Sequence, residues 1–270
     1  MHRTAKKVWL EGPQREGAPS WMFALSVLTR HEFRNRYRAQ ALGVVWSLLN
    51  PIVMMGILSL IFTRVFRSAT PNFPIFMLIG LIMWQFVASA ASAGTSTFVS
   101  HGELIKRTMF PRQLLPLAVM LSYGMNFAVE SSVLFIFIPI FPAAFRLTPA
   151  LLLIPVILAF LLILLAGISL MVSVLNVIYR DVAYLVNTAL LILYWLTPII
   201  YPVEIIPEPY QTALKCNPLT GILNGLRGCI MTGTMPSLLM WGSIVLPSLL
   251  VFAIGWAVFK HYEKMVLDYV

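Results

Sequence analysis

One acidic side chain, Glu130, lies inside an apolar stretch that the sequence predicts to cross a membrane. A carboxylate in that environment is costly, so it is either a functional group or a hydrogen-bonded group that fixes helix packing. Ser131 and Asn126 are the neighbouring candidates for such a bond. A lone acid without a partner base makes a poor proton relay, and this favours the packing role.

The sequence lacks the motifs of common catalytic sites. A phosphate-binding loop requires Gly-Lys followed by Ser or Thr, and no lysine here precedes either residue. Neither HExxH nor GxSxG occurs, and the histidines lie outside the predicted spans, at His2, His31, His101 and His261. We therefore expect no catalytic residue, metal or cofactor in this chain. If it moves cargo uphill, the energy must come from a partner or an ion gradient.

A basic stripe precedes the first apolar stretch. Arg30, Arg34 and Arg38 recur at intervals of four residues, so a helix places them on one face. The preceding half of the segment 21–40 carries bulky apolar side chains. This combination predicts a helix lying at the membrane surface, with the arginines on phosphate headgroups. The alternative is an ordinary basic flank to the first span.

Aromatic residues, 12% of the chain, supply candidate surfaces for stacking sugars. Such residues also form belts at membrane interfaces or pack helices. The candidate translocation path consists of Trp84, Tyr123, Glu130, Tyr194, Trp195 and Tyr201.

Small residues accompany this path in the segment 89–100. A helix places Ser89, Ala93 and Thr97 on one face, and Ser92, Ser96 and Ser100 on another. Four-residue spacing of small side chains lets helices approach closely, which is the expected role. Lining a wet path is the alternative.

The elements that must position these residues are membrane helices. The 270 residues are 59% hydrophobic and 11% charged, whereas soluble domains carry roughly 25% charged residues. Apolar stretches long enough to cross a bilayer of about 30 Å occur at 43–66, 74–99, 113–139, 150–178, 182–201 and 237–259. The predicted fold is therefore an all-α integral membrane protein with six transmembrane helices.

The chain divides into three parts around these spans. Residues 1–42 form a cytoplasmic arm and an amphipathic interface helix, 43–259 the transmembrane domain, and 260–270 a cytoplasmic tail. Within the domain, 101–112 is a cytoplasmic loop. The outer segment 202–236 is rich in proline and glycine, and its apolar piece is too short to span, so a re-entrant or interfacial helix is expected.

Charge sets the expected orientation. Fourteen lysines and arginines fall on the side that carries both termini and five on the other, which places both termini in the cytoplasm. We therefore expect the basic residues behind the net charge of +9 to set the topology and to contact anionic lipid, not nucleic acid. The first 20 residues are polar, so the first span is expected to act as the insertion signal. Cys216 and Cys229 in the outer segment form either a disulfide or two thiols.

Four stretches resemble one protein family in order and spacing. They are RYRAQALGVVWSLLNP (36–51), GELIKRTMFPRQLLPLA (102–118), IYRDVAYLV (178–186) and YPVEIIPEPYQTALKCNPLTGILNGLR (201–227). Together they resemble the polysaccharide-export ABC transporter permeases, the membrane subunits that export lipid-linked O-antigen, capsule or wall teichoic acid.

This resemblance implies a homodimer in the bacterial cytoplasmic (inner) membrane with two ATP-binding cassette subunits, which bind ATP and Mg. A lipid-linked glycan would pass between the two copies, among membrane lipids. Coupling to the ATPase would fall on Glu103, Lys106, Arg107, Phe110, Arg112, Arg180 and Asp181. The interface helix would rest on the same partner, and the outer gate would contain Asn217, Pro218 and Arg227.

Three other kinds of protein compete with this interpretation: an ion-coupled secondary transporter or lipid flippase, an intramembrane enzyme, and a lipid-shaping or scaffold protein without transport. An ion-coupled secondary transporter or lipid flippase would need several charges within the membrane, and Glu130 alone is available. An intramembrane enzyme would need clustered catalytic side chains within the spans, and these are missing.

Overall fold

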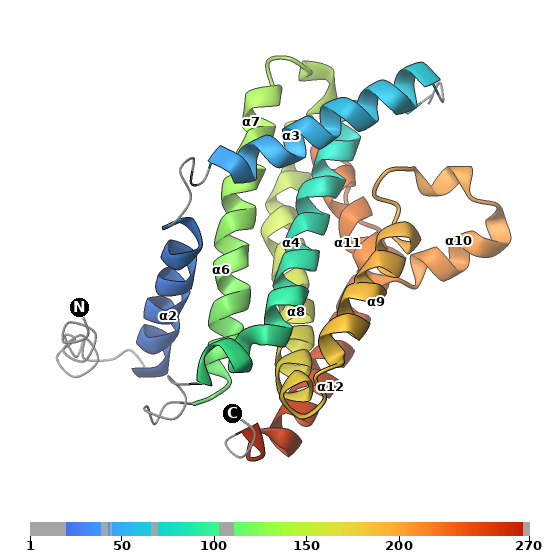
Figure 1. Ribbon diagram of the computed structural model, residues 1–270. Helices are drawn as coiled ribbons and strands as arrows, with labels where there is room; N and C mark the ends of the chain where they lie inside the picture. The colour runs from blue at the N-terminus through green and yellow to red at the C-terminus, as the bar shows by residue number, and fades with distance from the viewer. Residues whose placement is uncertain (1–19, 39–42, 44, 66–69, 103–110, 267–270) are drawn as a thin grey trace.

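The computed structural model describes residues 20–38, 43, 45–65, 70–102 and 111–266, and these residues form helices and connecting turns without a strand. Figure 1 shows an elongated helical bundle. In chain order its α-helices are α2 (Ser20–Tyr37), α3 (Val45–Leu60), α4 (Phe73–Ser100), α6 (Leu114–Ser131), α7 (Val133–Phe137), α8 (Ile154–Ile178), α9 (Val182–Leu196), α10 (Glu208–Lys215), α11 (Pro218–Arg227) and α12 (Leu238–Tyr262).

Short π and 3-10 turns extend several of these helices. A π turn continues α3 over Ile61–Val65, and another follows α11 over Gly228–Thr232. The 3-10 turns are Pro142–Ala144, Pro149–Leu153 and Val203–Ile205.

Among the described residues, five helical segments are long and apolar enough to cross a membrane: Val45–Val65, Phe73–Ser100, Leu114–Phe137, Pro149–Ile178 and Leu238–Tyr262. Their ends lie within a few residues of five predicted spans. The sixth prediction, 182–201, corresponds to α9, whose 15 residues make it shorter than these five. Its predicted end is wrong, because Thr197 is extended (φ −101°, ψ 131°). Pro198 follows, and a proline disfavours helical backbone in the residue before it.

The centre of the bundle is formed by α4, α6, α8 and α12. Large side chains such as Met83 of α4, Leu161 of α8 and Ile244 of α12 are fully or nearly fully buried in one cluster. Helices α8 and α12 meet through Gly167 and Gly255, where a Cβ added to Gly255 would run into the Gly167 backbone. Absent side chains therefore let the two backbones touch, a way of packing membrane helices that small residues make possible.

Helix α2 differs from the predicted surface helix. Figure 1 shows it beside α6 and roughly along it, rather than across the end of the bundle. The cause is packing: Leu28 is buried in a cluster that contains Leu114, Leu115 and Ala118 of α6. The polar side chain of Thr29 is also buried and donates to the Leu25 carbonyl.

The outer segment folds as two short helices of different burial. No residue of α10 is buried, whereas eight of the ten residues of α11 are. In Figure 1, α10 projects from the side of the bundle and α11 lies within it. Asn217 caps α11, because its side chain accepts from the Leu219 backbone N–H at 3.0 Å. A buried short helix at this position is compatible with the predicted re-entrant segment.

Candidate functional site

An open groove of about 640 Å³ runs between α4, α6 and α9, and we call it the α4–α9 groove. Its lining residues are Trp84, Ala88, Ser89, Ser92, Ala93, Ser96, Tyr123, Asn187, Leu190, Leu191 and Tyr194. The lining contains aromatic rings, hydroxyls and an amide, and no described residue in it carries a charge. Such a surface suits an uncharged or weakly charged polar ligand.

Three residues of the predicted translocation path meet in this groove. Trp84 and Tyr194 are edge to face, with ring centroids 5.5 Å apart. The third, Tyr123, is held from behind by α2, since the Arg36 guanidinium carbon lies 3.3 Å from its ring centroid. Arg36 also donates to Ser122 Oγ at 2.9 Å. Sequence reasoning missed Arg36, because it lies off the predicted arginine stripe.

The small residues of α4 lie on two different surfaces, one packed closely against α8 and one open to the α4–α9 groove. Gly94 faces α8, where an added Cβ would lie 3.2 Å from Ser169 Cα, so that side is closely packed. On the other side Ser92 Oγ lies 3.2 Å from Asn187 Oδ1 and joins α4 to α9 across the groove. The predicted face of Ser89, Ala93 and Thr97 is divided. Its first two residues line the groove and Thr97 is buried.

The other three path residues lie outside the groove lining. Glu130 is buried, and its Oε1 accepts from Asn126 Nδ2 at 2.7 Å. Asn126 also receives a hydrogen bond from the Tyr37 hydroxyl, so Glu130 belongs to a network between α2 and α6. The Tyr201 hydroxyl donates to the Trp195 carbonyl at 2.6 Å, and the Trp195 ring is exposed. Glu130 therefore makes one of the two hydrogen bonds that the sequence offered, the one to Asn126.

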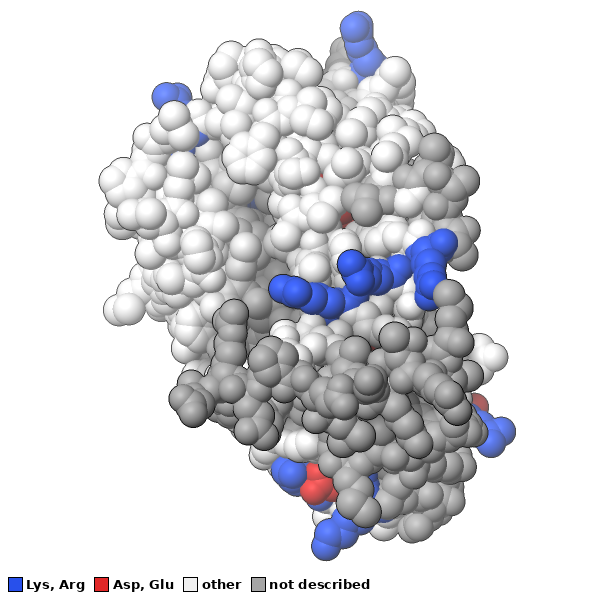
Figure 2. All heavy atoms as spheres, turned by 90° about the vertical axis from the view of Figure 1, so that its left-hand side faces the viewer, with Lys and Arg blue, Asp and Glu red and all other residues white. Residues whose placement is uncertain are grey.

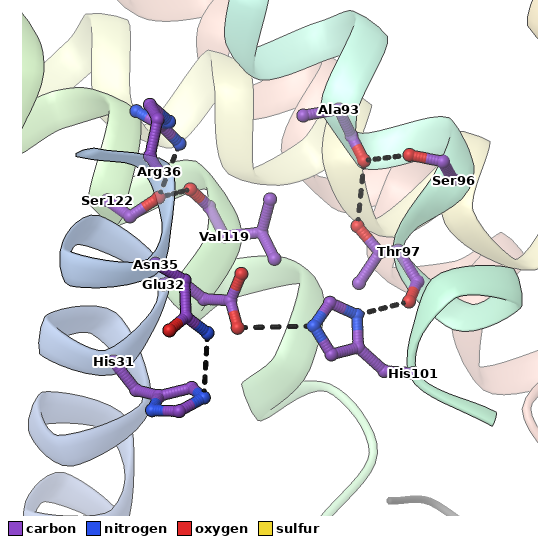
Figure 3. Close-up of polar contacts among 10 residues, drawn as sticks. All are labelled: His31, Glu32, Asn35, Arg36, Ala93, Ser96, Thr97, His101, Val119 and Ser122. Atoms are coloured by element: carbon purple, nitrogen blue, oxygen red, sulfur yellow. Dashed lines mark hydrogen bonds and ion pairs between the residues drawn. The ribbon is translucent and has the colours of Figure 1, made fainter. Parts of the chain in front are cut away.

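At one end of the bundle, which we call the His101 end, α2 is joined to the end of α4 (Figure 3). His101 Nδ1 lies 2.8 Å from the Thr97 carbonyl oxygen, and Nε2 lies 3.1 Å from Glu32 Oε1. A carbonyl and a carboxylate only accept hydrogen bonds, so both ring nitrogens must carry a proton to satisfy both contacts. The geometry therefore selects the imidazolium cation.

The pKa shifts of His101 and Glu32 also favour the charged form of each side chain. The hydrogen bond to Glu32 raises the pKa of His101 against the opposing effect of its partial burial. The bond to His101 lowers the pKa of Glu32, with smaller contributions from the charges of His101, His31 and Arg36. Sequence reasoning missed this pair, because its members are 69 residues apart and no local pattern connects them.

The predicted coupling residues are placed in part. Glu103, Lys106, Arg107 and Phe110 lie outside the described residues. Arg112 donates to the Glu263 carbonyl and so connects the start of α6 to the end of α12. Arg180 and Asp181 are exposed in the turn between α8 and α9.

At the opposite end, which we call the Arg227 end, a buried arginine joins three segments. Arg227 is 6% exposed and donates to the carbonyls of Pro198 at 2.6 Å and Ile199 at 2.7 Å. It also donates to the Phe76 carbonyl at 3.0 and 3.2 Å, and its guanidinium carbon lies 3.4 Å from the Phe76 ring centroid. Arg227 therefore ties α11 to the first turn of α4 and to the backbone beyond α9.

The other predicted outer-gate residues belong to the same joint. Asn217 Nδ2 donates to Thr197 Oγ1 at 3.1 Å, and Pro218 begins α11. All three predicted residues thus gather around the end of α9. Cys216 and Cys229 in this segment are free thiols, one exposed and one buried, so the disulfide alternative is wrong.

The predicted arginine stripe lies on an open surface. Arg30, Arg34 and Arg38 are all exposed. Figure 2 shows a band of lysine and arginine side chains across the face of the molecule that carries α2.

Comparison with known proteins gives consistent matches. Residues 24–231 match the family described as ABC-2 type transporter. The O-antigen export system permease protein RfbA of Klebsiella pneumoniae is 32% identical over 214 residues, 78% of this chain and 81% of that protein. The protein of the same name from Myxococcus xanthus is 27% identical over 77% of this chain and 80% of that protein. The polysialic acid transport protein KpsM of Escherichia coli is 25% identical over 94% of this chain and 98% of that protein.

Proposed function

The chain belongs to the ABC-2 type transporter family, and from this premise we propose that it is the permease subunit of a polysaccharide exporter. The cargo would be a lipid-linked glycan of the O-antigen or capsule class, carried across the cytoplasmic membrane. The names of the similar proteins support this choice, since they refer to O-antigen export and polysialic acid transport. A wall teichoic acid polymer is a further member of the same proposed cargo class.

The single observation that carries the proposal is the lining of the α4–α9 groove. Trp84, Tyr123 and Tyr194 offer aromatic surfaces, and Ser92 and Asn187 offer hydrogen-bonding groups. Sugar rings have apolar faces that stack on aromatic rings and hydroxyls that bond to such polar groups. An ion-coupled transporter would instead need charges along its path, and the groove lining has none.

We further propose that the energy comes from two copies of a separate ATP-binding subunit at the His101 end. The segment 101–112 would contact this subunit, with Arg112, Arg180 and Asp181 beside it. The chain would act as a homodimer with both termini in the cytoplasm. Helix α9 would be the sixth crossing, and α11 would be re-entrant.

The test is export by the permease reconstituted with its ATPase in proteoliposomes. Trp84→Ala with Tyr194→Ala removes the edge-to-face pair, and we expect glycan export to fall at least about tenfold, the effect of losing about 1.4 kcal/mol of contact with the moving glycan. Tyr184→Ala is the matched control, because this exposed tyrosine also lies on α9 but outside the groove.

Two results would contradict the proposal. Undiminished export by the Trp84 and Tyr194 double variant would remove the groove from the path. Failure of any ATPase to associate with the wild-type chain would favour the ion-coupled secondary transporter or lipid flippase, for which Glu130→Gln is the first variant to assay.

A further inference from the structure

Of the arginines at the end of α2, one points away from the others. Arg30, Arg34 and Arg38 are exposed. Arg36 lies two residues beyond Arg34, which corresponds to about 200° around a helix, and it is half-buried against α6. A cation that is taken out of solvent in this way needs a partner that stabilises it.

The Arg36 guanidinium is held over the ring of Tyr123. Its carbon atom lies 3.3 Å from the ring centroid, and its Nη2 donates to Ser122 Oγ at 2.9 Å. Ser122 is fully buried and donates its own proton to the Val119 carbonyl at 2.7 Å, so its oxygen can only accept from Arg36. Figure 3 shows this short chain of bonds reaching from α2 into α6. The guanidinium is therefore fixed by a buried acceptor while it covers one face of the ring.

The ring explains an arginine at this position better than the hydroxyl does. Nη1 of Arg36 is buried and has no hydrogen-bond partner among the described residues. A buried donor without a partner is destabilising, and a glutamine could donate to Ser122 with fewer donors left to satisfy. What the guanidinium adds is a planar cation that stacks on an aromatic ring. The cation is thus retained although one of its donors is unpaired, and Tyr123 is the group that it contacts.

Tyr123 carries this contact into the α4–α9 groove. Its ring packs against the main buried cluster and lines the groove beside Ser92 and Ala93 of α4. Among the described residues, none forms a hydrogen bond with its hydroxyl. The orientation of the ring therefore depends on packing and on Arg36, and the hydroxyl is available to a ligand.

The next residue, Tyr37, attaches the same turn of α2 without contacting the groove. Its hydroxyl donates to Asn126 Oδ1 and lies 3.0 Å from Ser47 Oγ on α3. Neither Tyr37 nor Asn126 lines the groove. Two neighbouring side chains thus fasten α2 to α6, and of the two only Arg36 contacts a groove residue.

We propose that Arg36 is a positioning residue for the glycan, which holds the Tyr123 ring in the orientation that the α4–α9 groove presents to its cargo. This inference rests on the proposed function and adds to it a residue outside the groove lining. It also makes α2 part of the groove, because a shift of α2 along α6 carries the guanidinium off the ring. The groove wall at Tyr123 is therefore set by two helices.

Fluorine NMR of a fluorotyrosine at position 123 tests the proposal in the permease purified with its ATPase. The probe is the lipid-linked glycan fraction extracted from cells that produce the protein. We expect Arg36→Gln to shift the resonance without glycan and to weaken glycan binding about fivefold, because glutamine keeps a donor for Ser122 but lacks the cation. Arg36→Lys should recover part of this affinity, since an ammonium also binds an aromatic face. A role confined to the Ser122 bond would make the two variants alike.

A double-mutant cycle separates the ring contact from general stability. Tyr123→Leu should lower glycan affinity about tenfold, and Arg36→Gln added to it should lower the affinity no further. If Arg36→Gln does not assemble, Arg36→Lys takes its place in the cycle. Tyr37→Phe is the matched control, because it removes the bonds to Asn126 and Ser47 and should lower the unfolding temperature while glycan affinity stays at the wild-type value.

Equal glycan affinity in wild type and Arg36→Gln would overturn the proposal, as would additive losses in the double variant. An equal loss in Tyr37→Phe would assign the effect to the attachment of α2 and would also overturn it. In these cases the proposed function stands if the Trp84 and Tyr194 double variant fails to export. A wild-type complex that neither binds nor exports the glycan would instead overturn the proposed function.

Discussion

Helices α8 and α9 follow one another in the chain but are held in place in opposite ways. Helix α8 packs backbone to backbone against α12 at Gly167 and Gly255. Helix α9 has no buried residue. Polar groups hold its two ends, and between them it meets α4 through the Ser92–Asn187 contact and the Trp84–Tyr194 ring pair. Near the His101 end, the Ala183 N–H donates to Asn176 Oδ1 at 3.0 Å. Beyond the other end, Arg227 holds the carbonyls of Pro198 and Ile199.

Because of this difference, the α8–α12 pair is a rigid scaffold, whereas α9 is a groove wall that can tilt. Contacts between backbones are lost over a fraction of an ångström, so α8 and α12 move as one body. A helix held by a few hydrogen bonds at its ends can tilt without unpacking a core. The α4–α9 groove lies between these two kinds of structure, with one wall on the core helix α4 and the other on α9.

The largest effect on stability is expected at the contact between α8 and α12, where an added side chain has no space. A Cβ at Gly167 would lie 2.5 Å from Phe252 Cα and 2.6 Å from the Val251 carbonyl oxygen, both backbone atoms that cannot rotate away. We expect Gly167→Ala to cost about 3 kcal/mol or to prevent assembly. Thermal unfolding of the detergent-purified protein measures this. Gly242→Ala on α12 is the control, since its Cβ meets nothing within 4 Å. Equal stability of the two variants would show that close contact at Gly167 does not hold α8 against α12.

The second effect concerns the Arg227 joint. Arg227→Gln leaves at least one of the buried carbonyls of Phe76, Pro198 and Ile199 unpaired, and we expect a loss of about 2 kcal/mol in stability. Export should fall more than ATPase activity does, because the end of α9 is released from α4. Lys215→Gln is the control, as this lysine is exposed on nearby α10. Wild-type export by Arg227→Gln would show that the joint does not shape the groove.

The third effect is pH dependence at the His101 end. The raised pKa of His101 means that its contribution is present below 6.5 and is lost as pH rises through the raised value. The lowered pKa of Glu32 means that its contribution is present above 4.5 and is lost as pH falls through the lowered value. The joint is therefore strongest between these limits, by about 1 kcal/mol.

Thermal unfolding between pH 5.5 and 8.5, a range chosen from about one unit below the ordinary histidine pKa to about two above it, measures this contribution. His101→Gln should flatten the profile, and Glu32→Gln should do the same. His261→Gln is the matched control, since His261 is an exposed histidine at the end of α12 and does not contribute to the pKa shifts of His101 or Glu32. If His261→Gln alone flattens the profile, the His101 joint is not the titrating element.

The smallest effect on stability is expected across the groove itself. Ser92→Ala removes the contact to Asn187, and we expect less than about 0.5 kcal/mol of change because the contact is solvent-exposed. Thr188→Ala on α9 is the control. A short cross-linker between cysteines introduced at positions 92 and 187 should nevertheless stop export. Continued export by the cross-linked protein would show that α9 is not a moving wall.

Much of the fold could be predicted because it depends on local sequence. Runs of apolar residues marked five spans, and the apolar piece of the segment 202–236 that was judged too short to span corresponds to α11. The end of α9 was missed because Pro198 was counted as part of an apolar run, although it disfavours helix in the residue before it. The position of α2 was missed because the burial of Leu28 depends on α6, which is remote in sequence.

The candidate site was only partly predictable for a related reason. Residue type singled out Trp84, Tyr123 and Tyr194, and the family resemblance singled out Arg227, but neither showed which side chains share a surface. The pairing of His101 with Glu32 and the contact of Gly167 with Gly255 depend on helix arrangement alone. A single glycine in an apolar helix is a weak signal until its partner helix is known.

The shortness of α9 has a consequence for the lipid around the molecule. Fifteen residues span roughly 22 Å, against a hydrocarbon core of about 30 Å. If α9 is the sixth crossing, as proposed, the bilayer beside it must thin locally or be met by the buried backbone beyond Leu196. Such mismatch costs a fraction of a kcal/mol per ångström. Lipid headgroups would then cross a shorter apolar distance beside α9 than beside the five longer helical segments of the described chain.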